Sequence, residues 1–196
     1  YQGLDGAFSE RKFRRFYVDP SVSIYDKKGN RHKITARAYY INNDNNDNQS
    51  NKSNNYTSEY QFLKELARLD AFFTTGISYS HTYASAELYG DSEFTQDNIA
   101  LYGQLDKSFG DRLNVGVGLR YEYYQQLSPE EFLGVTIPDG KAKESKLIKR
   151  FSANYELDSY TFLRASWGEG FRFPVIAEKF ISTTFGGFEI FPNVEL

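Results

Sequence analysis

The side chains that could do chemistry in this sequence are few, and their spacing does not form a catalytic set. There is no cysteine, which excludes disulfides and thiolate metal sites, and the histidines are His32 and His81. Without a spaced cluster of His and Glu, a zinc site is not expected. The adjacent acids Glu130 and Glu131 fall in a polar stretch, where neighbouring carboxylates are usually only solvated. Because no nucleophile–base pair is visible, the sequence predicts a protein that is not an enzyme.

The candidate cation ligands lie in the polar stretch 42–55, "NNDNNDNQSNKSNN", which contains no apolar residue. Asp44, Asn46 and Asp47 offer the hard oxygen ligands that calcium prefers. The stretch lacks the terminal glutamate that binds calcium through two oxygens in an EF-hand loop. The expectation is therefore a long solvated loop and no cofactor, with calcium at these three residues as the alternative.

The segments that must position these residues alternate between apolar and polar side chains, as in "RLNVGVGLRYEYY", 112–124. Leu113, Val115 and Val117 share one parity, and Asn114 and Arg120 share the other. A period of two predicts a strand with two unlike faces. The pattern alone does not say which face is inside. In a soluble sandwich the apolar face meets a protein core, whereas in an outer-membrane barrel it meets lipid and the polar face lines the lumen.

The same alternation recurs along the chain in segments of about ten residues. The stretch 56–69 is ambiguous because it also carries a helical stripe of Tyr60, Leu63, Leu66 and Leu69. A strand is favoured there, since its neighbours are strands and a turn follows. The sequence thus predicts eight strands, at 16–25, 32–41, 56–69, 73–83, 99–109, 112–124, 147–157 and 160–171.

The connections between the predicted strands alternate in length. Short turns are expected near 27–30, 69–71, 110–111 and 158–159, with Gly29 and Asn30 suited to positive φ. Long polar loops are expected at 42–55, 88–98 and 126–143, and another begins after 170. All short turns then lie at one end of an up-and-down sheet, as in outer-membrane barrels. A soluble Greek-key sandwich has no reason to keep this order, although a soluble sheet with one wet face remains the alternative.

Composition and charge favour the same fold. The chain has 16 Tyr and 17 Phe, and its net charge of −3 gives no basic excess for nucleic acid. No run of about 18 apolar residues exists, so a transmembrane helix is not expected. The polar face carries charges that suit a wet lumen but could not be buried without partners: Arg37, Arg120, Glu122, Arg150, Glu156 and Arg164. Aromatic residues cluster toward strand ends, as the interface girdles of a barrel require.

Two segments resemble the barrel of TonB-dependent outer-membrane receptors. In "SWGEGFRFPVIAEKF", 166–180, the family's Gly-Phe-Arg-x-Pro turn is matched by Gly170, Phe171, Arg172 and Pro174. Glu178 matches the next element, but Lys179 stands where the family usually has Leu. The second segment, "ALYGQLDKSFGDRLNVGVGLRYEYY", 100–124, resembles the family's recurrent hairpin. The Asn-rich loop and the many tyrosines resemble receptors of the Bacteroides group.

The resemblance implies a complete picture of fold and function. The fold is all-β, an antiparallel up-and-down transmembrane β-barrel, and the chain supplies about eight strands of a larger barrel of about 22 strands. Residues 1–196 would then be a partial β-barrel domain of a longer chain, with the plug domain outside this segment. The implied function is import of a large scarce nutrient, such as an iron chelate or siderophore, haem, cobalamin or glycan, driven by energy from TonB.

The implied partners are outer-membrane lipid, the TonB complex through a plug outside this segment, and a small-molecule or oligosaccharide cargo; nucleic acid is not expected. The implied location is the outer membrane of a bacterial cell. Two rival functions stay open at this point. One is an outer-membrane structural or adhesive barrel without transport, and the other is a soluble extracellular β-domain that binds glycans.

Cargo contacts are expected where lumen-facing strand ends meet the long loops. Arginine and tyrosine at a wet mouth can hold anionic or aromatic cargo by charge-assisted hydrogen bonds and stacking. The alternative is that these residues only bind loops or the plug. The candidate ligand-binding residues are Tyr39, Arg120, Glu122, Tyr124 and Arg172. Both histidines are expected on the lipid-facing side, near strand ends.

Overall fold

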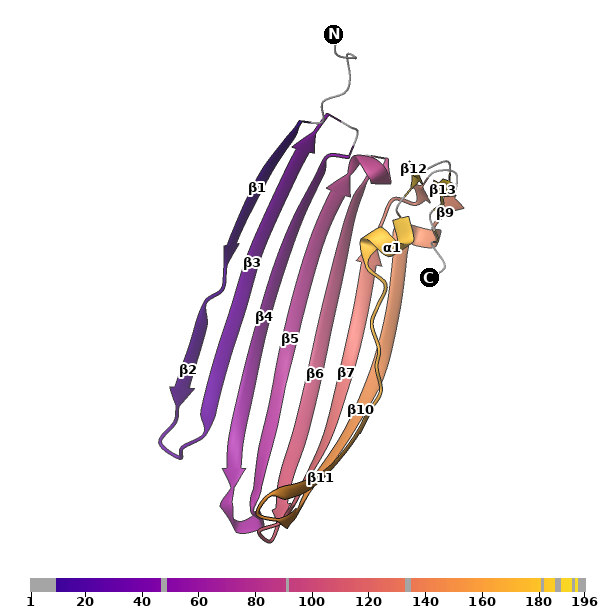
Figure 1. Ribbon diagram of the computed structural model, residues 1–196. Coiled ribbons are helices and arrows are strands. Elements are labelled where there is room, and N and C mark those ends of the chain that lie inside the picture. The colour runs from indigo at the N-terminus through magenta and orange to yellow at the C-terminus, as the bar shows by residue number, and fades with distance from the viewer. Residues whose placement is uncertain are drawn as a thin grey trace, which may run out of the picture.

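One antiparallel sheet dominates the computed structural model, which describes residues 10–46, 49–90, 92–132, 135–180, 182–185, 188–191 and 193. Its strands lie side by side in chain order, and β2 continues the β1 edge next to β3 (Figure 1). The strands are β1 (Arg11–Val18), β2 (Ser21–Tyr25), β3 (Arg31–Asn45), β4 (Asn51–Leu66), β5 (Ala71–Ala86), β6 (Glu93–Phe109), β7 (Leu113–Leu127), β10 (Lys141–Asp158) and β11 (Thr161–Gly168).

Smaller elements lie in the connections. Three are 3-10 turns, η1 (Ala67–Leu69), η2 (Glu87–Tyr89) and η3 (Pro138–Gly140). The others are β8 (Glu131–Phe132), β9 (Val135–Thr136), α1 (Ile176–Phe180), β12 (Thr183–Phe185) and β13 (Phe188–Ile190). β8 pairs with β9 and β12 pairs with β13, each outside the main sheet. The predicted all-β, up-and-down fold is confirmed.

The main sheet is an open, curved part of a barrel. Within the described residues its two edges, β1 with β2 at one side and β11 at the other, pair with no further strand. Open edges would leave backbone N–H and C=O groups unsatisfied in hydrocarbon. The sheet therefore needs the remaining strands of the barrel to be stable in a bilayer.

The register sorts the side chains onto two unlike faces. One cross-strand row runs through Tyr60, Ile77 and Leu101, and the next residue along each of β4, β5 and β6 is Gln61, Gly76 and Tyr102. The first row belongs to the apolar face, called here the outer face. The second belongs to the polar face, called here the inner face. The outer face is unusually exposed for apolar residues, with Leu101 at 59% and Val117 at 49%.

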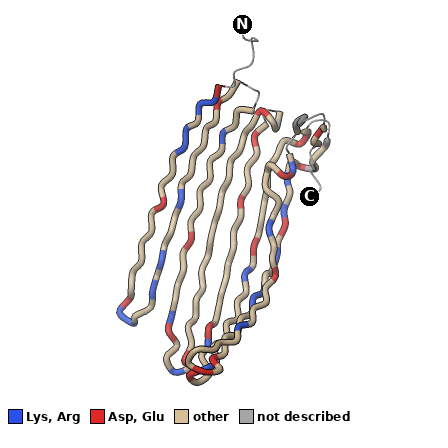
Figure 2. The backbone as a smooth tube through the Cα atoms, viewed as in Figure 1, with Lys and Arg blue, Asp and Glu red and all other residues tan. Residues whose placement is uncertain are grey.

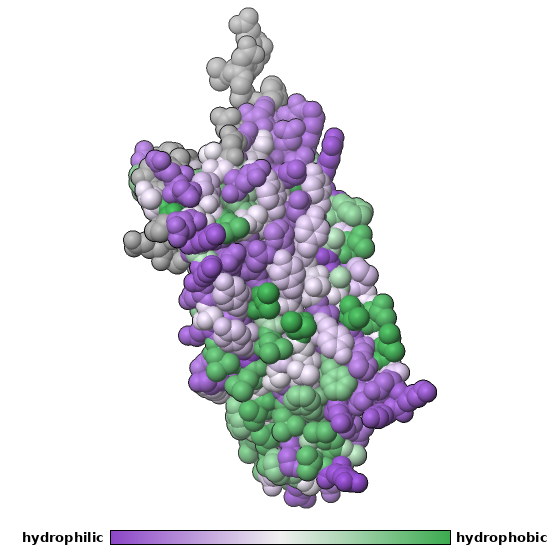
Figure 3. Space-filling view, turned by 180° about the vertical axis from the view of Figure 1, so that it is seen from behind, coloured by the Kyte–Doolittle hydropathy of each residue, from purple (hydrophilic) through white to green (hydrophobic). Residues whose placement is uncertain are grey.

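The outer face is apolar only over part of its height. The main strands have up to 18 residues, as in β10, whereas about 9–11 tilted residues cross a bilayer. Hydrophobic residues gather in the lower half of the molecule, and the upper part is mostly hydrophilic (Figure 3). Between the two regions lies an outer-face girdle of Tyr40, Tyr56, Tyr79 and Tyr123. The strands thus continue well above the membrane-spanning zone.

The predicted long loops are shorter in the structure. The expected loop at 42–55 is wrong for most of its length, because β3 continues to Asn45 and β4 begins at Asn51. Asn and Ser have low intrinsic β propensity, but the ladder already formed below overrides that preference. Ser50 supports the tip by donating its hydroxyl to the Asn45 carbonyl at 3.1 Å. Likewise, β6 begins at Glu93, and β7 and β10 reduce the predicted loop at 126–143 to 128–140.

The short turns and the strand at 56–69 are where the sequence predicts them, although two details differ. The predicted strand at 16–25 is interrupted at Asp19–Pro20, because proline lacks the N–H that a ladder needs. Gly29 has a φ of 79°, as predicted. The expectation of positive φ at Asn30 is wrong. Instead, Asn30 donates from its backbone and its side chain to the Asp26 carboxylate, at 2.9 and 2.7 Å.

Charge placed on the two faces should have opposite consequences. Val117→Lys puts a charge among lipid tails near mid-height and should lower the free energy of unfolding by about 2–4 kcal/mol. The neighbouring Gly118→Lys points into the lumen, where a Cβ would lie 3.8 Å from Arg150 and Gln104, and should cost far less. Denaturant titration of the full-length receptor in phospholipid vesicles measures both. Equal losses would contradict the assignment of faces.

The stability that the turn between β2 and β3 contributes should decrease in acid. Hydrogen bonds from Asn30, then from the Lys28 N–H and from His32, lower the pKa of Asp26 to about 2, against an ordinary value of about 3.9. The stabilisation is therefore complete above about pH 4 and is lost as pH falls toward 2. Asp26→Asn keeps the acceptor oxygen but cannot titrate. Its folded fraction in vesicles should depend less steeply on pH in this window than that of the wild type.

Candidate functional site

The chain leaves the sheet after β11 and crosses the inner face. The Glu169 N–H donates to the Lys149 carbonyl at 3.0 Å. Further on, the Lys146 ammonium lies 5.4 Å from the centre of the Phe171 ring, and the Phe173 ring stacks on Tyr124 with centroids 4.6 Å apart. In Figure 1 this segment, in yellow, runs along β7 and β10 to α1. The Gly-Phe-Arg-x-Pro motif therefore lies against the inner face of the sheet.

A clamp at the start of α1 holds the motif in shape. The Arg172 guanidinium donates to Glu178 Oε1 at 2.6 Å, and the Val175 N–H donates to Glu178 Oε2 at 2.9 Å. These two donors hold the pKa of Glu178 below its ordinary value, and the Val175 N–H has the larger effect. Arg172, predicted as a cargo contact, is exposed while it makes this ion pair. Any contact between Arg172 and cargo would therefore be made by a guanidinium that is already paired with Glu178.

Above the segment, three parts of the chain share one apolar cluster, called here the roof cluster. Phe180 of α1 lies 4.3 Å from Phe94 of β6 and 5.5 Å from Phe132 of β8, measured between ring centroids. Ile137 and Ile176 complete the cluster, and all five residues are at most 8% exposed. This cluster is not among the features predicted from the sequence. The apolar letters "FLGVTI" inside the predicted polar loop 126–143 were the signal that could have shown it.

Tyr124 is an anchor beneath the roof cluster. It is 1% exposed, and its hydroxyl contacts the Pro174 carbonyl at 3.4 Å and donates to Gln126 Oε1. Tyr124 is predicted from the sequence to be a cargo contact. The structure instead buries it against the motif segment, because its ring stacks on Phe173. Gln126 and Lys179, which are not among the residues predicted from the sequence, are also buried, at 1% and 5% exposed.

A second set of contacts lies lower on the inner face. Arg120 Nε and Glu122 Oε1 form an ion pair at 2.5 Å, and the Arg120 guanidinium lies 5.6 Å from the centre of the Tyr102 ring. The Tyr102 hydroxyl donates to Glu59 Oε1 at 2.6 Å and accepts from Gln61 at 3.2 Å. This polar wall brings together Arg120 and Glu122, as predicted. It also contains Tyr102 and Glu59, which sequence parity places on the same face.

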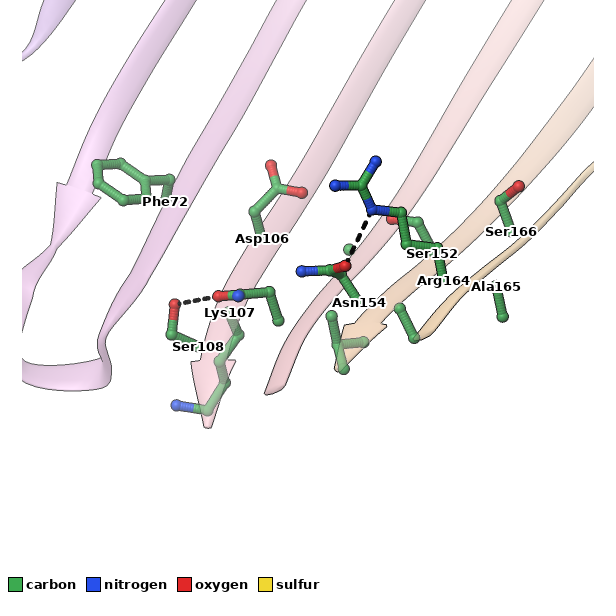
Figure 4. Close-up of a pocket in the computed structure, with 13 residues that line it drawn as sticks. Phe72, Asp106, Lys107, Ser108, Ser152, Asn154, Arg164, Ala165 and Ser166 are labelled. Carbon is green, nitrogen blue, oxygen red and sulfur yellow. Dashed lines mark hydrogen bonds between the residues drawn. The ribbon is translucent and has the colours of Figure 1, made fainter. Parts of the chain in front are cut away.

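Near the short turns the inner face has a hollow of about 450 Å³ between β6, β7, β10 and β11 (Figure 4). Small residues make the space, Gly116 on β7, Ser152 on β10 and Ser166 on β11. Asp106 and Arg164 point toward it, and Arg164 Nε donates to Asn154 Oδ1 at 3.2 Å. The hollow supplies polar groups of both signs at the lower end of the lumen wall.

The structure does not bring Tyr39 to the other predicted contacts. Tyr39 lies on the inner face of β3, with the Arg15 guanidinium 6.0 Å from its ring centre. Three strands separate β3 from β7. At about 4.8 Å per strand spacing, Tyr39 is roughly 19 Å from Tyr124 around the wall. Arg120, Glu122 and Tyr124 share one strand, and Arg172 belongs to the segment above them.

The cation candidates and histidines lie away from this wall. Asp44 pairs in register with Lys12 at the top of β3, Asn46 follows the strand, and Asp47 lies outside the described residues. In the described part of the chain, no group of three His, Cys, Asp or Glu side chains could hold a metal. Calcium binding stays a prediction. His32 and His81 lie on the outer face, bonded at 2.8 Å to Tyr60 and Asp97.

Comparison with known proteins decides the family. The family model of the TonB-dependent receptor-like β-barrel matches residues 3–194. The chain belongs to this family. No curated protein matches the sequence. TonB-dependent receptors are transporters of the bacterial outer membrane and not an enzyme family, and the chain is a barrel portion of such a receptor. Among the described residues, no helix is long and apolar enough to cross a membrane.

One glycine should be critical for the polar wall of the receptor. A Cβ on Gly76 would lie 2.5 Å from the Tyr102 hydroxyl and 2.6 Å from the Tyr60 carbonyl. Gly76→Ala should therefore displace Tyr102, break its bond to Glu59, and destabilise the barrel by about 1–3 kcal/mol. Gly103→Ala is the matched control, because its nearest atoms would be 4.0 Å away. Chemical unfolding in vesicles compares them, and a harmless Gly76→Ala would refute the close packing.

Proposed function

We propose that the receptor containing this chain captures a large, scarce nutrient at the cell surface and imports it with energy passed through TonB. The family match is the observation that carries the proposal. The cargo classes are iron chelates such as siderophores, haem, cobalamin and glycans. The connection to the TonB complex would be made by a plug domain outside this segment.

The inner face supports a role in cargo passage. It presents charged and hydroxyl groups from the hollow near the short turns up to Arg120 and Glu122. The side chains of Arg120 and Arg172 are 37% and 68% exposed, so both can still meet a solute in the lumen. We propose Arg120, Glu122 and Arg172 as cargo contacts, with Tyr39 on the distant part of the wall. Tyr124 then supports the motif segment.

The exposed apolar residues of the outer face favour a protein embedded in a bilayer over a soluble glycan-binding domain. A soluble glycan-binding domain would have to leave side chains such as Leu101, Val117 and Leu163 in water, where they are 49–59% exposed. Contiguous apolar surface of this extent is rare on soluble monomers. The remaining alternative is a structural barrel without transport, and the growth experiment described next distinguishes it from a nutrient transporter.

Growth of a deletion strain of the native bacterium tests the proposal. The strain is grown with a single limiting source from a panel of iron chelates, haem, cobalamin and glycans. Growth should fail on one class, return with the wild-type gene, and fail again when TonB is absent. Normal growth on every source, or rescue without TonB, would favour the structural barrel.

Residue-level support comes from complementation with matched variants. Arg120→Ala removes an inner-face charge, whereas Lys143→Ala removes a charge from the outer face above the girdle. Uptake of the identified nutrient should fall for Arg120→Ala and remain at the wild-type rate for Lys143→Ala. Equal uptake by both would remove Arg120 from the cargo path.

A further inference from the structure

Two cations on the upper part of the outer face have no acidic partner. Arg14 belongs to β1 and Lys52 belongs to β4, and both side chains are exposed. Basic residues gather along the upper part of β1 in Figure 2. Among the described residues, neither Arg14 nor Lys52 takes part in an ion pair. Both are therefore free to bind an anion from outside the chain.

The cross-strand register brings the two cations to one place on the sheet. Asn42 of β3 is the partner of Arg14 on one side and of Lys52 on the other. All three residues have the parity of Tyr40, which puts them on the outer face. Neighbouring strands are about 4.8 Å apart. The long side chains of Arg14 and Lys52 can therefore both reach a group that lies over Asn42.

This row of three residues lies at the height of lipid headgroups. Arg14 and Asn42 are two residues above Phe16 and Tyr40, which are partners across β1 and β3. At about 3.3 Å per residue and a tilt of about 40°, two residues correspond to a rise of roughly 5 Å. The headgroup region of each leaflet is about 5–8 Å thick. A cation at this height on the outer face meets lipid phosphates, whereas the lumen lies behind the sheet.

Two acids stand near the cations without pairing with them. Glu93 of β6 lies two strands from Lys52, and its carboxylate accepts the Tyr83 hydroxyl at 2.8 Å. Asp44 lies above the row on β3, where it stands opposite Lys12 in the register. Asp44 is thus the charge that opposes an anion at this site.

The three side chains provide the groups that recognise a phosphate. A guanidinium can donate two parallel hydrogen bonds to phosphate oxygens, and an ammonium adds a point charge. The amide of Asn42 can donate between them. Below the row, the Phe16 ring is 61% exposed and offers an apolar surface. Cations above an exposed ring suit a lipid, whose phosphate lies above its acyl chains, better than a free phosphate ion.

We propose that Arg14, Asn42 and Lys52 form a site on the outside of the barrel wall that binds the phosphate of an anionic lipid. Arg14 and Lys52 hold the phosphate from two sides, and Asn42 donates to it from beneath. The acyl chains extend down past Phe16 into the bilayer. The site goes beyond nutrient import, because it faces the membrane and not the cargo path.

The test titrates lipid onto the full-length receptor in detergent micelles and follows binding by native mass spectrometry. The probes are phosphatidylglycerol and phosphatidylcholine, with inorganic phosphate as a competitor. Arg14→Gln and Lys52→Gln should each weaken phosphatidylglycerol binding about fivefold, the effect of one cation near a charged headgroup. Phosphatidylcholine should bind more weakly, because its choline neutralises its own phosphate. Both substituted side chains are exposed, so the fold should be unaffected.

Two further variants separate a site from general attraction between charges. Arg11→Gln removes the same charge from the same strand, but Arg11 has the opposite parity to Arg14 and lies on the inner face. This control should bind phosphatidylglycerol like the wild type. Asp44→Asn removes the opposing charge and should strengthen binding.

Several results would overturn the lipid site. One is an equal loss of phosphatidylglycerol binding in Arg11→Gln and Arg14→Gln, which would indicate attraction to the whole chain. Another is unchanged binding in Arg14→Gln and Lys52→Gln, or equal affinity of the wild type for the two lipids. Displacement of phosphatidylglycerol by an equal concentration of inorganic phosphate would identify a site for soluble anions instead.

Discussion

The cross-strand register is the constraint on which the rest of the structure depends. Because side chains alternate with a period of two, a slip of β7 by one residue against β6 would send Arg120 into lipid and Tyr121 into the lumen, while Tyr102 of β6 stayed on the inner face. The polar wall, the contact between Gly76 and Tyr102 and the covered region near Tyr124 all require the same alignment. Short turns that pin each hairpin at its lower end hold this alignment from strand to strand.

The sequence contains most of this lower framework. The alternation in 112–124, the short turns and the inner-face charges are local signals, since each depends on a few neighbouring residues. The family motif is equally local, and Gly170–Pro174 could be recognised without a structure. The strand at 56–69 could not be predicted from its own residues alone, because its apolar residues also fit a helical stripe. Only the neighbouring strands favoured a strand there.

The upper part of the molecule could not be predicted in the same way. Asn51–Asn55 have no intrinsic reason to be a strand, and they become one because β5 already offers them a hydrogen-bonded edge. Phe94, Phe132 and Phe180 come from three distant parts of the chain, so no short window contains the roof cluster. Lys179 lies in the same short helix as Phe180, and both residues are buried. A lysine in a short exposed-looking segment gives no sign that it will be covered.

The length of the strands also sets how far the barrel wall rises above the bilayer. Beyond the tyrosine girdle the strands continue for about four to seven residues, which at about 3.3 Å per residue and a tilt of about 40° is roughly 10–18 Å. The rim of the wall thus lies well beyond the level of the lipid headgroups. Charged side chains at that height face the medium, and its salt screens their long-range interactions. The roof cluster is held by buried aromatic contacts, which salt does not screen, so the upper wall keeps its shape in a saline habitat.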